Sequence, residues 1–346
     1  MSAQHQSKDS ISPHPIRMIW VVSDGTAGMR LQAIALADSL ANSLSNCDAI
    51  RVEDIILSPP PLLRYLPRLA RLLPSASLRA MLRYTDGVAD EDRDIADIII
   101  TCGRRMAGVS IALRRLDPRG LCRTIHIQDP RLPSHYFDLL LVPEHDPARG
   151  ANVITSRASL NRLSPEKIDH AATLLGSKWR DLPAPMVAVL LGGTNRRYQL
   201  SEVMIETMVK KLAEFATVNE ASLAIIPSRR TPDRLLMTLS RQLEGQRFAI
   251  ADTDEANPYP GILALADAVI VTSDSVNMAS EAAMTGKPVL IADWQVETGR
   301  IAAFHRTMIK AGHTAPMTTK IPKNSFTPLR EMPMITAVVK RHLGLD

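Results

Sequence analysis

The strongest constraint on the fold of this chain is a pattern that occurs twice: a buried apolar run, a glycine turn and then a helix. In the first copy, the β-branched run of residues 16–22 leads through two glycines into apolar positions spaced as on one face of a helix over residues 29–44. In the second copy, the run of residues 186–191 ends directly at a pair of glycines. Strands that are apolar throughout are typical of parallel sheets covered by helices on both faces. The pattern therefore predicts an α/β fold.

Both halves continue the alternation of apolar runs with helical spacing. Further strands are predicted at residues 96–101, 124–128, 138–142, 152–155, 223–227, 248–251, 268–272 and 289–292. Helices are predicted at about residues 200–215, from Pro232 onward, and at residues 262–266, 276–285 and 299–310. We expect two Rossmann-like parallel-sheet domains facing a cleft, because ligands of such sheets bind beyond the carboxyl ends of the strands.

Polar segments suggest where the domains begin and end. Residues 1–16 lack an apolar core and are predicted to be a disordered tail, and the first domain is predicted at residues 17–175. A polar, proline-containing stretch up to residue 185 is predicted to be a linker, and the second domain follows at residues 186–315. Residues 316–346 are a C-terminal tail that could pack back on the first domain.

Composition narrows the function classes. A net charge of +5 and an aromatic content of 4% provide too little positive charge and too few rings for a nucleic-acid partner. The three cysteines, Cys47, Cys102 and Cys122, have no CxxC spacing, which argues against a disulfide framework or a structural zinc site. No apolar run reaches the roughly 18 residues of a spanning helix. We therefore expect a cytoplasmic protein whose only membrane contact, at the inner face of the cytoplasmic membrane, is peripheral.

The turn that ends the first strand of each half is a candidate anion site. Gly25 and Gly28 lie where a strand hands over to a helix, so backbone N–H groups and the helix dipole there could hold a phosphate. Gly192, Gly193 and Thr194 occupy the equivalent place in the second half. The alternative is a tight turn that merely needs glycine for its backbone conformation.

The segment of residues 271–290 is the most informative about chemistry. A strand is predicted to end at Thr272, and the polar residues that follow can cap a helix on which Glu281 lies nearly two turns along. A carboxylate there can accept two hydroxyl hydrogen bonds, as the vicinal diol of a ribose requires, while Ser275 and Asn277 face phosphate. The alternative is an ordinary capped helix with one solvated glutamate.

This segment resembles the nucleotide-sugar site of GT-B glycosyltransferases, in particular the lipid-linked N-acetylglucosaminyltransferase of peptidoglycan synthesis. The similar residues are 273–281, Gly286 and Pro288, and Glu281 falls on the family's ribose-binding glutamate. That transferase has a histidine in its first glycine loop that is suited to general-base work, and Met29 stands at the matching position here. The resemblance therefore leaves the base unassigned.

The chain as a whole resembles the mitochondrial-fission ELM-type family over roughly residues 17–315. The resemblance rests on Ser23-Asp24-Gly25 with Gly28 and Gln32, Gln128-Asp129-Pro130, Pro143-Glu144-His145-Asp146, Gly192-Gly193, Ser228-Arg229-Arg230-Thr231, Asn257-Pro258-Tyr259 and Thr272-Ser273-Asp274-Ser275. It implies a GT-B-like fold with the acceptor on the first domain and a nucleotide-diphosphate sugar on the second. The candidate nucleotide-sugar-binding residues are Gly25, Gly28, Gly192, Gly193, Thr194, Ser228, Arg229, Arg230, Asn257, Tyr259, Ser273, Asp274, Ser275, Asn277 and Glu281.

Three loop residues are candidates for acid–base catalysis. Asp24, or His145 with Asp146, could take a proton from an acceptor hydroxyl within hydrogen-bond reach, although histidines in loops are commonly plain polar residues. The sequence has no Asp-X-Asp triplet, so we expect no metal and no cofactor beyond the sugar nucleotide. Helix N-termini and Arg229 or Arg230 would then stabilise the leaving diphosphate.

A basic segment at residues 62–84 is a candidate membrane contact. It carries five arginines, and no acidic residue occurs between Asp54 and Asp86. Such a leucine-rich basic stretch can lie on an anionic bilayer. Pro67 and Pro74 divide it into short pieces, so the alternative is a pair of helices that cover the core with solvated arginines.

Three function hypotheses remain open. The first is a glycosyltransferase that uses a nucleotide-diphosphate sugar and a lipid-linked or cell-envelope acceptor. The second is a GT-B-fold nucleoside-diphosphate-sugar epimerase, which is the older label of the bacterial members of the ELM-type family. The third is a non-catalytic scaffold of that family; its plant branch is linked to recruiting a dynamin-like protein to mitochondria, a role not expected here because the sequence shows no presequence pattern.

Overall fold

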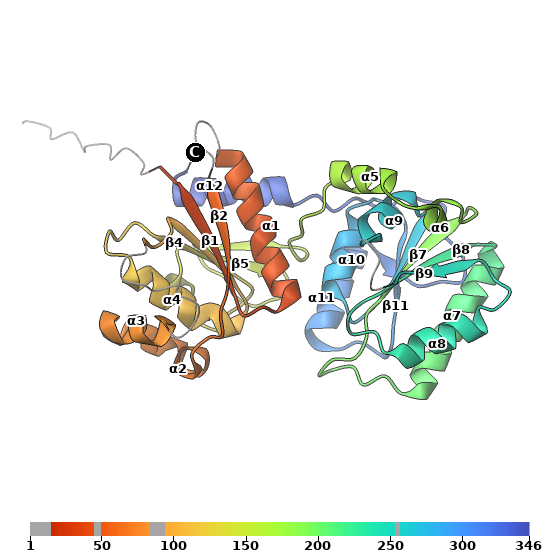
Figure 1. The fold of residues 1–346 in the computed structure, drawn as a ribbon, viewed down its shortest axis with the longest axis horizontal. Coiled ribbons are helices and arrows are strands. Elements are labelled where there is room, and N and C mark those ends of the chain that lie inside the picture. The colour runs from red at the N-terminus through yellow and green to blue at the C-terminus, as the bar shows by residue number, and fades with distance from the viewer. Residues whose placement is uncertain (1–14, 45–49, 84–93, 253–256, 346) are drawn as a thin grey trace, which may run out of the picture. The chain divides into compact units, whose positions relative to one another are not determined.

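The computed structural model describes residues 15–44, 50–83, 94–252 and 257–345 (Figure 1). Most of the predicted N-terminal tail, Cys47 and Tyr84 lie outside the described residues. The chain divides into two compact units, each with its own sheet. The first contains the described residues up to Val142, residues 148–154 and the segment from Met332 onward, and the second contains Pro143–Pro147 and Thr155–Glu331.

The sheet of the first unit has six strands in the order β2-β1-β3-β4-β5-β6. The strands are β1 (Met18–Ser23), β2 (Arg51–Ile56), β3 (Ile98–Cys102), β4 (Arg123–Ile127), β5 (Leu139–Pro143) and β6 (Val153–Ser156). The pairs from β2 through β5 are parallel, with Ile19 opposite Ile98 and Ile99 opposite Thr124. The central strand β3 is buried along its whole length, as the apolar run predicts.

Helices cover this sheet. They are α1 (Ala27–Leu44), α2 (Pro61–Tyr65), η1 (Pro67–Arg71), α3 (Ser75–Arg83), η2 (Arg104–Met106), α4 (Ala107–Leu116), η3 (Ser134–Tyr136) and α12 (Met332–Leu343). Helix α12 comes from the C-terminal tail and lies in the first unit. There the hydroxyl groups of Ser39 on α1 and Thr336 are 2.7 Å apart, and the Lys340 ammonium donates to the Ser43 carbonyl.

The sheet of the second unit has the order β12-β11-β10-β7-β8-β9 and parallel pairing. Its strands are β7 (Met186–Leu191), β8 (Ser222–Pro227), β9 (Phe248–Ile250), β10 (Ala268–Thr272), β11 (Val289–Ala292) and β12 (Ala315–Pro316). Its helices are α5 (Pro165–Thr173), α6 (Ser177–Arg180), α7 (Glu202–Asn219), α8 (Asp233–Gln242), α9 (Tyr259–Leu265), α10 (Val276–Ala283) and α11 (Gly299–Lys310).

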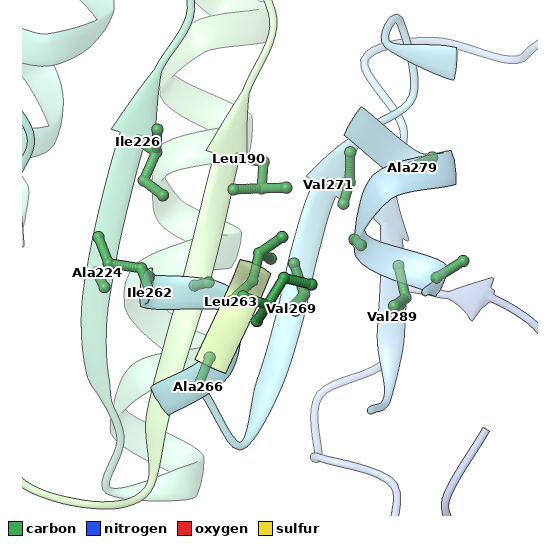
Figure 2. Packing of buried hydrophobic residues seen from close by; sticks show 14 of the residues in the cluster. Leu190, Ala224, Ile226, Ile262, Leu263, Ala266, Val269, Val271, Ala279 and Val289 are labelled. Carbon is green, nitrogen blue, oxygen red and sulfur yellow. The ribbon is translucent and has the colours of Figure 1, made fainter. Parts of the chain in front are cut away.

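The second sheet is buried on both faces, which explains its uninterrupted apolar strands. Leu190 of β7 packs in one cluster with residues of α9 and α10, whereas its neighbour Val189 packs in a second cluster with residues of α7 and α8. Figure 2 shows Leu190 on the same face as Val269 of β10, with Leu263 of α9 against them. The predicted α/β class and the pair of parallel sheets are confirmed.

The domain limits differ from those expected from the sequence. Residues 155–175 belong to the second unit, because α5 packs so closely on α9 that a Cβ atom on Gly261 would lie 2.7 Å from the Ala171 carbonyl oxygen. The stretch up to residue 185, predicted to be a linker, contains the short helix α6, and its Trp179 is buried in the core of the second unit. The indole ring holds this segment on the unit. Among the described helices, none combines the length and the hydropathy needed to cross a bilayer.

Candidate functional site

The loops at the carboxyl ends of β7, β8 and β10 meet around one buried carboxylate. The Asp274 side chain is inaccessible to solvent and accepts hydrogen bonds from the Gly193 N–H at 3.1 Å and the Trp294 indole N–H at 3.0 Å. The Thr272 hydroxyl donates at 2.8 Å to Oδ1, the oxygen that also accepts from Trp294, and the Arg230 guanidinium lies 3.0 Å from Oδ2. Asp274 therefore organises the three loops, and both of its oxygens are used within the protein.

The glycine pair of this loop is required by packing against Asp274 and Arg230. A Cβ atom on Gly192 would collide with the Asp274 carboxylate, and one on Gly193 would collide with the Arg230 carbonyl. The Gly192 N–H donates to the Thr272 hydroxyl at 2.8 Å, and the Thr194 N–H donates to the Arg230 carbonyl at 3.1 Å. These N–H groups are bonded inside the protein, so side chains rather than this backbone are available to an anion.

The loop after β8 presents the cationic side chains. The Thr231 hydroxyl donates to the Leu191 carbonyl at 2.9 Å, and the Ser228 hydroxyl accepts from the Arg230 N–H at 3.3 Å, which fixes the turn. The Arg230 side chain is 38% exposed despite its ion pair, and Arg229 is exposed. The guanidinium of Arg230 is thus held at one end and open to solvent at the other.

A second hydrogen-bond network surrounds Glu297, a residue not predicted from the sequence. Its carboxylate, 7% exposed, accepts from the Ser273 hydroxyl at 2.6 Å, the Tyr198 hydroxyl at 2.7 Å and the Arg197 guanidinium at 3.2 Å. Burial, and then the hydrogen bond to Glu297, raises the pKa of Tyr198. Glu297 follows β11, which lies beside β10 in the sheet. Its position after a strand that ends at the same sheet edge is the sequence feature from which it could have been predicted.

Helix α10 begins at this edge. The Ser275 hydroxyl caps it by accepting the Met278 N–H at 3.4 Å, and Asn277 lies partly exposed in its first turn. Both residues were expected at the helix start, and the structure places them there. Because Ser275 acts as the cap, Asn277 is the side chain of this pair that a ligand could bind.

Glu281 lies further along α10 and is not a solvated glutamate. It is partly buried, and its Oε2 atom accepts a hydrogen bond from the Tyr259 hydroxyl at 2.8 Å. Tyr259 begins α9, where its N–H donates to the Asn257 side chain at 3.2 Å. Burial raises the pKa of Glu281 to about 7, and the Tyr259 hydrogen bond only partly opposes this effect. The structure thus contradicts the alternative of an exposed carboxylate.

In the first unit, Asp24 lies in the turn before α1 and is held by two groups of the protein. Its Oδ1 atom accepts the Thr26 N–H at 3.0 Å, and its Oδ2 atom lies 2.8 Å from the Arg105 guanidinium. Gly25 has a φ of +78°, a conformation that favours glycine, and Gly28 lies in the first turn of α1. The side chain of Asp24 is 3% exposed, so both of its oxygens face groups of the protein rather than solvent.

His145 and Asp146 belong to the second unit although they follow a strand of the first sheet. Asp146 forms an ion pair of 3.0 Å with Arg300 in the first turn of α11, and the His145 ring meets Phe304 edge-on at 5.9 Å between centroids. Burial lowers the pKa of His145, so its imidazole is neutral at pH 7. Its Nδ1 atom is buried and has no hydrogen-bond partner among the described residues.

Metal-binding clusters and reactive thiols were sought among the described residues. No group of three or more His, Cys, Asp or Glu residues there could hold a metal ion. Cys102 and Cys122 are free and buried, and burial raises the pKa of both thiols. Neither thiol is suited to nucleophilic attack.

The family model described as Mitochondrial fission ELM1 matches residues 27–343, which is most of the chain. The chain belongs to this family. It is 28% identical to the mitochondrial fission protein ELM1 of Arabidopsis thaliana over 250 residues, covering 64% of this chain but only 57% of the plant protein. It is also 28% identical to the uncharacterized protein RP120 of Rickettsia prowazekii (strain Madrid E) over 314 residues, covering 79% of this chain and 82% of that protein.

Solved structures confirm the GT-B fold of this ELM1-family chain. A putative UDP-N-acetylglucosamine 2-epimerase from Listeria monocytogenes matches 95% of this chain and 98% of its own with a TM-score of 0.57 and 13% identity. MurG of Acinetobacter baumannii matches 94% and 92% with a TM-score of 0.51 and 13% identity. At such identities the likeness concerns the fold alone.

Proposed function

We propose that this ELM1-family chain is a glycosyltransferase-like enzyme whose second unit binds a nucleoside-diphosphate sugar. The observation that carries the proposal is Glu281, a partly buried carboxylate whose one hydrogen-bond donor among the described residues is the neutral hydroxyl of Tyr259. A carboxylate has acceptor sites for about four hydrogen bonds, and burial without enough donors is unfavourable. The vicinal diol of a ribose supplies two further donors to such a group.

The phosphates of the ligand have cationic partners near the same sheet edge. Arg230 is anchored by Asp274 at 3.0 Å and keeps part of its guanidinium exposed. A guanidinium fixed by a buried carboxylate loses little conformational entropy when it binds phosphate, and it can neutralise charge on a leaving diphosphate. Arg229 and the start of α10 add to this positive potential.

The transfer requires a base for the acceptor. In such a reaction the acceptor oxygen forms a bond to the anomeric carbon, the bond from that carbon to the diphosphate breaks, and the nucleoside diphosphate leaves with the electron pair. The acceptor proton goes to a general base. His145 suits this role because its imidazole is neutral and the residue is partly exposed, whereas both oxygens of Asp24 are engaged by Thr26 and Arg105.

His145 has a structural connection to the proposed donor site within the second unit. Ser273 at the end of β10 bonds Glu297, and Arg300, which pairs with Asp146, follows three residues later at the start of α11. The segment that carries His145 is therefore tied to the same sheet edge as the Asp274 loops. We propose a lipid-linked or cell-envelope hydroxyl compound as the acceptor.

Titration calorimetry with UDP, UDP-N-acetylglucosamine and other nucleoside diphosphate sugars tests the donor site. Glu281→Ala is expected to weaken binding by about 1.5–3 kcal/mol, the range for a hydrogen bond to a charged group. Glu206→Ala, at an exposed position on α7 of the same unit, is the matched control and should leave the dissociation constant unchanged. Equal affinities for wild type and Glu281→Ala would remove Glu281 from the site.

Product analysis separates the three functions that share this fold. Incubation with a bound sugar nucleotide and membrane extract should release nucleoside diphosphate and label the acceptor if the protein is a transferase. Inversion of the configuration at one carbon of the sugar, in the absence of an acceptor, would identify an epimerase instead. If none of the nucleotides binds, the proposed donor site is absent and the scaffold hypothesis is favoured.

A further inference from the structure

The segment from α2 through α3 has one face in the core and one in solvent. Leu63, Ala70, Leu78 and Leu82 are fully buried in the cluster that also contains residues of α4. Figure 1 shows α2 and α3 beside α4 in the first unit. The opposite face carries three large apolar side chains in solvent, Tyr65 at 69%, Leu66 at 56% and Leu72 at 79% exposure. The core of the unit therefore does not account for these three side chains.

The geometry of η1 arranges these side chains in rows. The Leu69 N–H donates to the Leu66 carbonyl at 3.0 Å, and the Leu72 N–H donates to the Leu69 carbonyl at 2.9 Å. Residues three apart are nearly eclipsed in a 3₁₀ helix, so these three leucines form one apolar row. The same spacing places Arg68 and Arg71, both exposed, in the adjacent row.

Charge distinguishes this surface from a chance exposure of leucines. The Arg64 guanidinium lies over the Tyr65 ring at 5.0 Å, and that of Arg71 lies over Tyr136 at 5.0 Å, so both are held at the surface beside aromatic rings. No acidic residue occurs between Asp54 and Asp86 in the sequence, and no ion pair of Arg64, Arg68 or Arg71 occurs among the described residues. An apolar row beside arginines that form no ion pair with any described residue is complementary to a bilayer with anionic headgroups, where the leucines enter the acyl boundary and the guanidinium groups bind phosphate.

We propose that this surface, formed by Tyr65, Leu66, Leu72, Arg64, Arg68 and Arg71, docks the protein on an anionic lipid bilayer. In this proposal the core-covering role and the membrane-contact role of the segment are compatible, because its buried leucines cover the core while its outer face binds lipid. The inference does not depend on the proposed donor site, since every residue that carries it lies in the first unit.

Flotation with vesicles of phosphatidylcholine containing about one third phosphatidylglycerol tests the proposal. The wild-type protein should bind these vesicles at low salt and be released as the salt concentration rises to about 300 mM. Salt screens the attraction, because the Debye length is roughly 10 Å at 0.1 M and becomes shorter at higher salt. Vesicles of phosphatidylcholine alone should bind much less. Absence of binding to the anionic vesicles at low salt would overturn the proposal.

Two double variants separate the contributions of charge and apolar contact. Arg68→Glu with Arg71→Glu should lower the partition coefficient by about 25-fold or more, since each basic residue near the surface contributes roughly fivefold. Leu66→Ser with Leu72→Ser should also weaken vesicle binding. The remaining binding should depend on salt as it does in the wild type, because the charges are unchanged. Vesicle binding that either double variant leaves unchanged would overturn the docking surface as defined.

The second unit provides a matched control. Helix α8 exposes Met237 at 66% and also Arg241, so Met237→Ser with Arg241→Glu removes a similar pair of side chains elsewhere. This variant should bind vesicles as the wild type does, and an equal loss of binding would show a nonspecific charge effect and overturn the assignment. All substituted side chains are exposed, so unchanged thermal unfolding is expected and confirms that each variant is folded.

Discussion

Replacing Glu281 by Gln should stabilise the second unit at high pH and have little effect at low pH. The carboxyl group has a folded-state pKa of about 7 because it is buried, compared with an ordinary value of 4.5. Below pH 4.5 the carboxyl group is protonated in the folded and in the unfolded protein. Between pH 4.5 and about pH 7 the folded protein holds a proton that the unfolded chain has released. The stability of the wild type therefore falls as the pH rises from 4.5 through 7.

The difference between the folded-state and ordinary pKa values of Glu281 sets the size of the change in the free energy of unfolding. At about 1.4 kcal/mol for each pKa unit, the ionised carboxylate reduces the free energy of unfolding by roughly 3 kcal/mol at pH 8. Glutamine keeps an oxygen that can accept from Tyr259 at the same place but carries no charge. For a unit of this size the gain at pH 8 corresponds to an increase in melting temperature of roughly 6–12 °C.

Thermal unfolding of wild type and Glu281→Gln at pH 5 and pH 8 measures this effect, with Glu206→Gln as the exposed control. At pH 5 the gain should shrink to less than about 1 kcal/mol. The same variant should bind ribonucleotides more weakly, because the charged acceptor of the diol is lost. A gain in stability that is equal at both pH values, or a loss at pH 8, would show that the protein accommodates the charge of Glu281 and would refute the argument from burial.

Three further substitutions test other parts of the structure. Asp274→Ala should lower the free energy of unfolding by about 3–5 kcal/mol in urea denaturation, because it leaves the Arg230 charge and two buried N–H groups without their acceptor; a change below 1 kcal/mol would contradict its organising role. His126 is fully buried, its pKa is lowered to about 3, and it pairs with Thr101, so its contribution is complete above pH 6.5 and falls as the pH drops toward 3. Wild type should therefore lose about 2 kcal/mol more than His126→Gln between pH 7.5 and pH 5, and parallel pH profiles would show that His126 does not titrate as argued. Once an acceptor is found, His145→Gln should reduce turnover by roughly 10²-fold to 10⁴-fold with unchanged donor affinity, while turnover equal to the wild type would return the role of base to Asp24.

The periodicity of the sequence was sufficient to predict the fold. Strands buried on both faces leave no polar alternation, so the runs that became β7, β10 and β11 were found to within a residue. Strand β2 was missed because it has the pattern of an edge strand, with exposed Arg51 and Ile56 and acidic residues between them. Residues 155–175 were assigned to the first domain because the contact of α5 with α9, which places them in the second unit, joins residues about ninety positions apart.

The sequence predicted which loops carry the candidate residues, but not how their polar groups are bonded to one another. The glycine turn at Gly192 and Gly193 was predicted to be an anion site, and the family resemblance placed Asp274 among the nucleotide-sugar-binding residues. In the structure, hydrogen bonds and close packing among these residues hold the loops together. Sequence shows which residues follow a strand, but it does not show whether their polar groups are already bonded to one another. That information depends on distances of a few ångströms between segments eighty residues apart.

His145 shows how connectivity can mislead an assignment. It follows β5, a strand of the first sheet, so chain order places it with the loops of the first unit. The ion pair of its neighbour Asp146 with Arg300, and its own edge-on contact with Phe304, attach it to α11 in the second unit. Asp24, which does belong to the first unit, is fixed by Thr26 and Arg105. A base must present a free acceptor atom to the proton it takes. The carboxylates of Asp24 and Asp146 are held in ion pairs with Arg105 and Arg300, whereas the His145 residue is partly exposed and its Nδ1 atom has no hydrogen-bond partner among the described residues. The choice between them therefore depends on hydrogen-bond occupancy rather than on position along the chain.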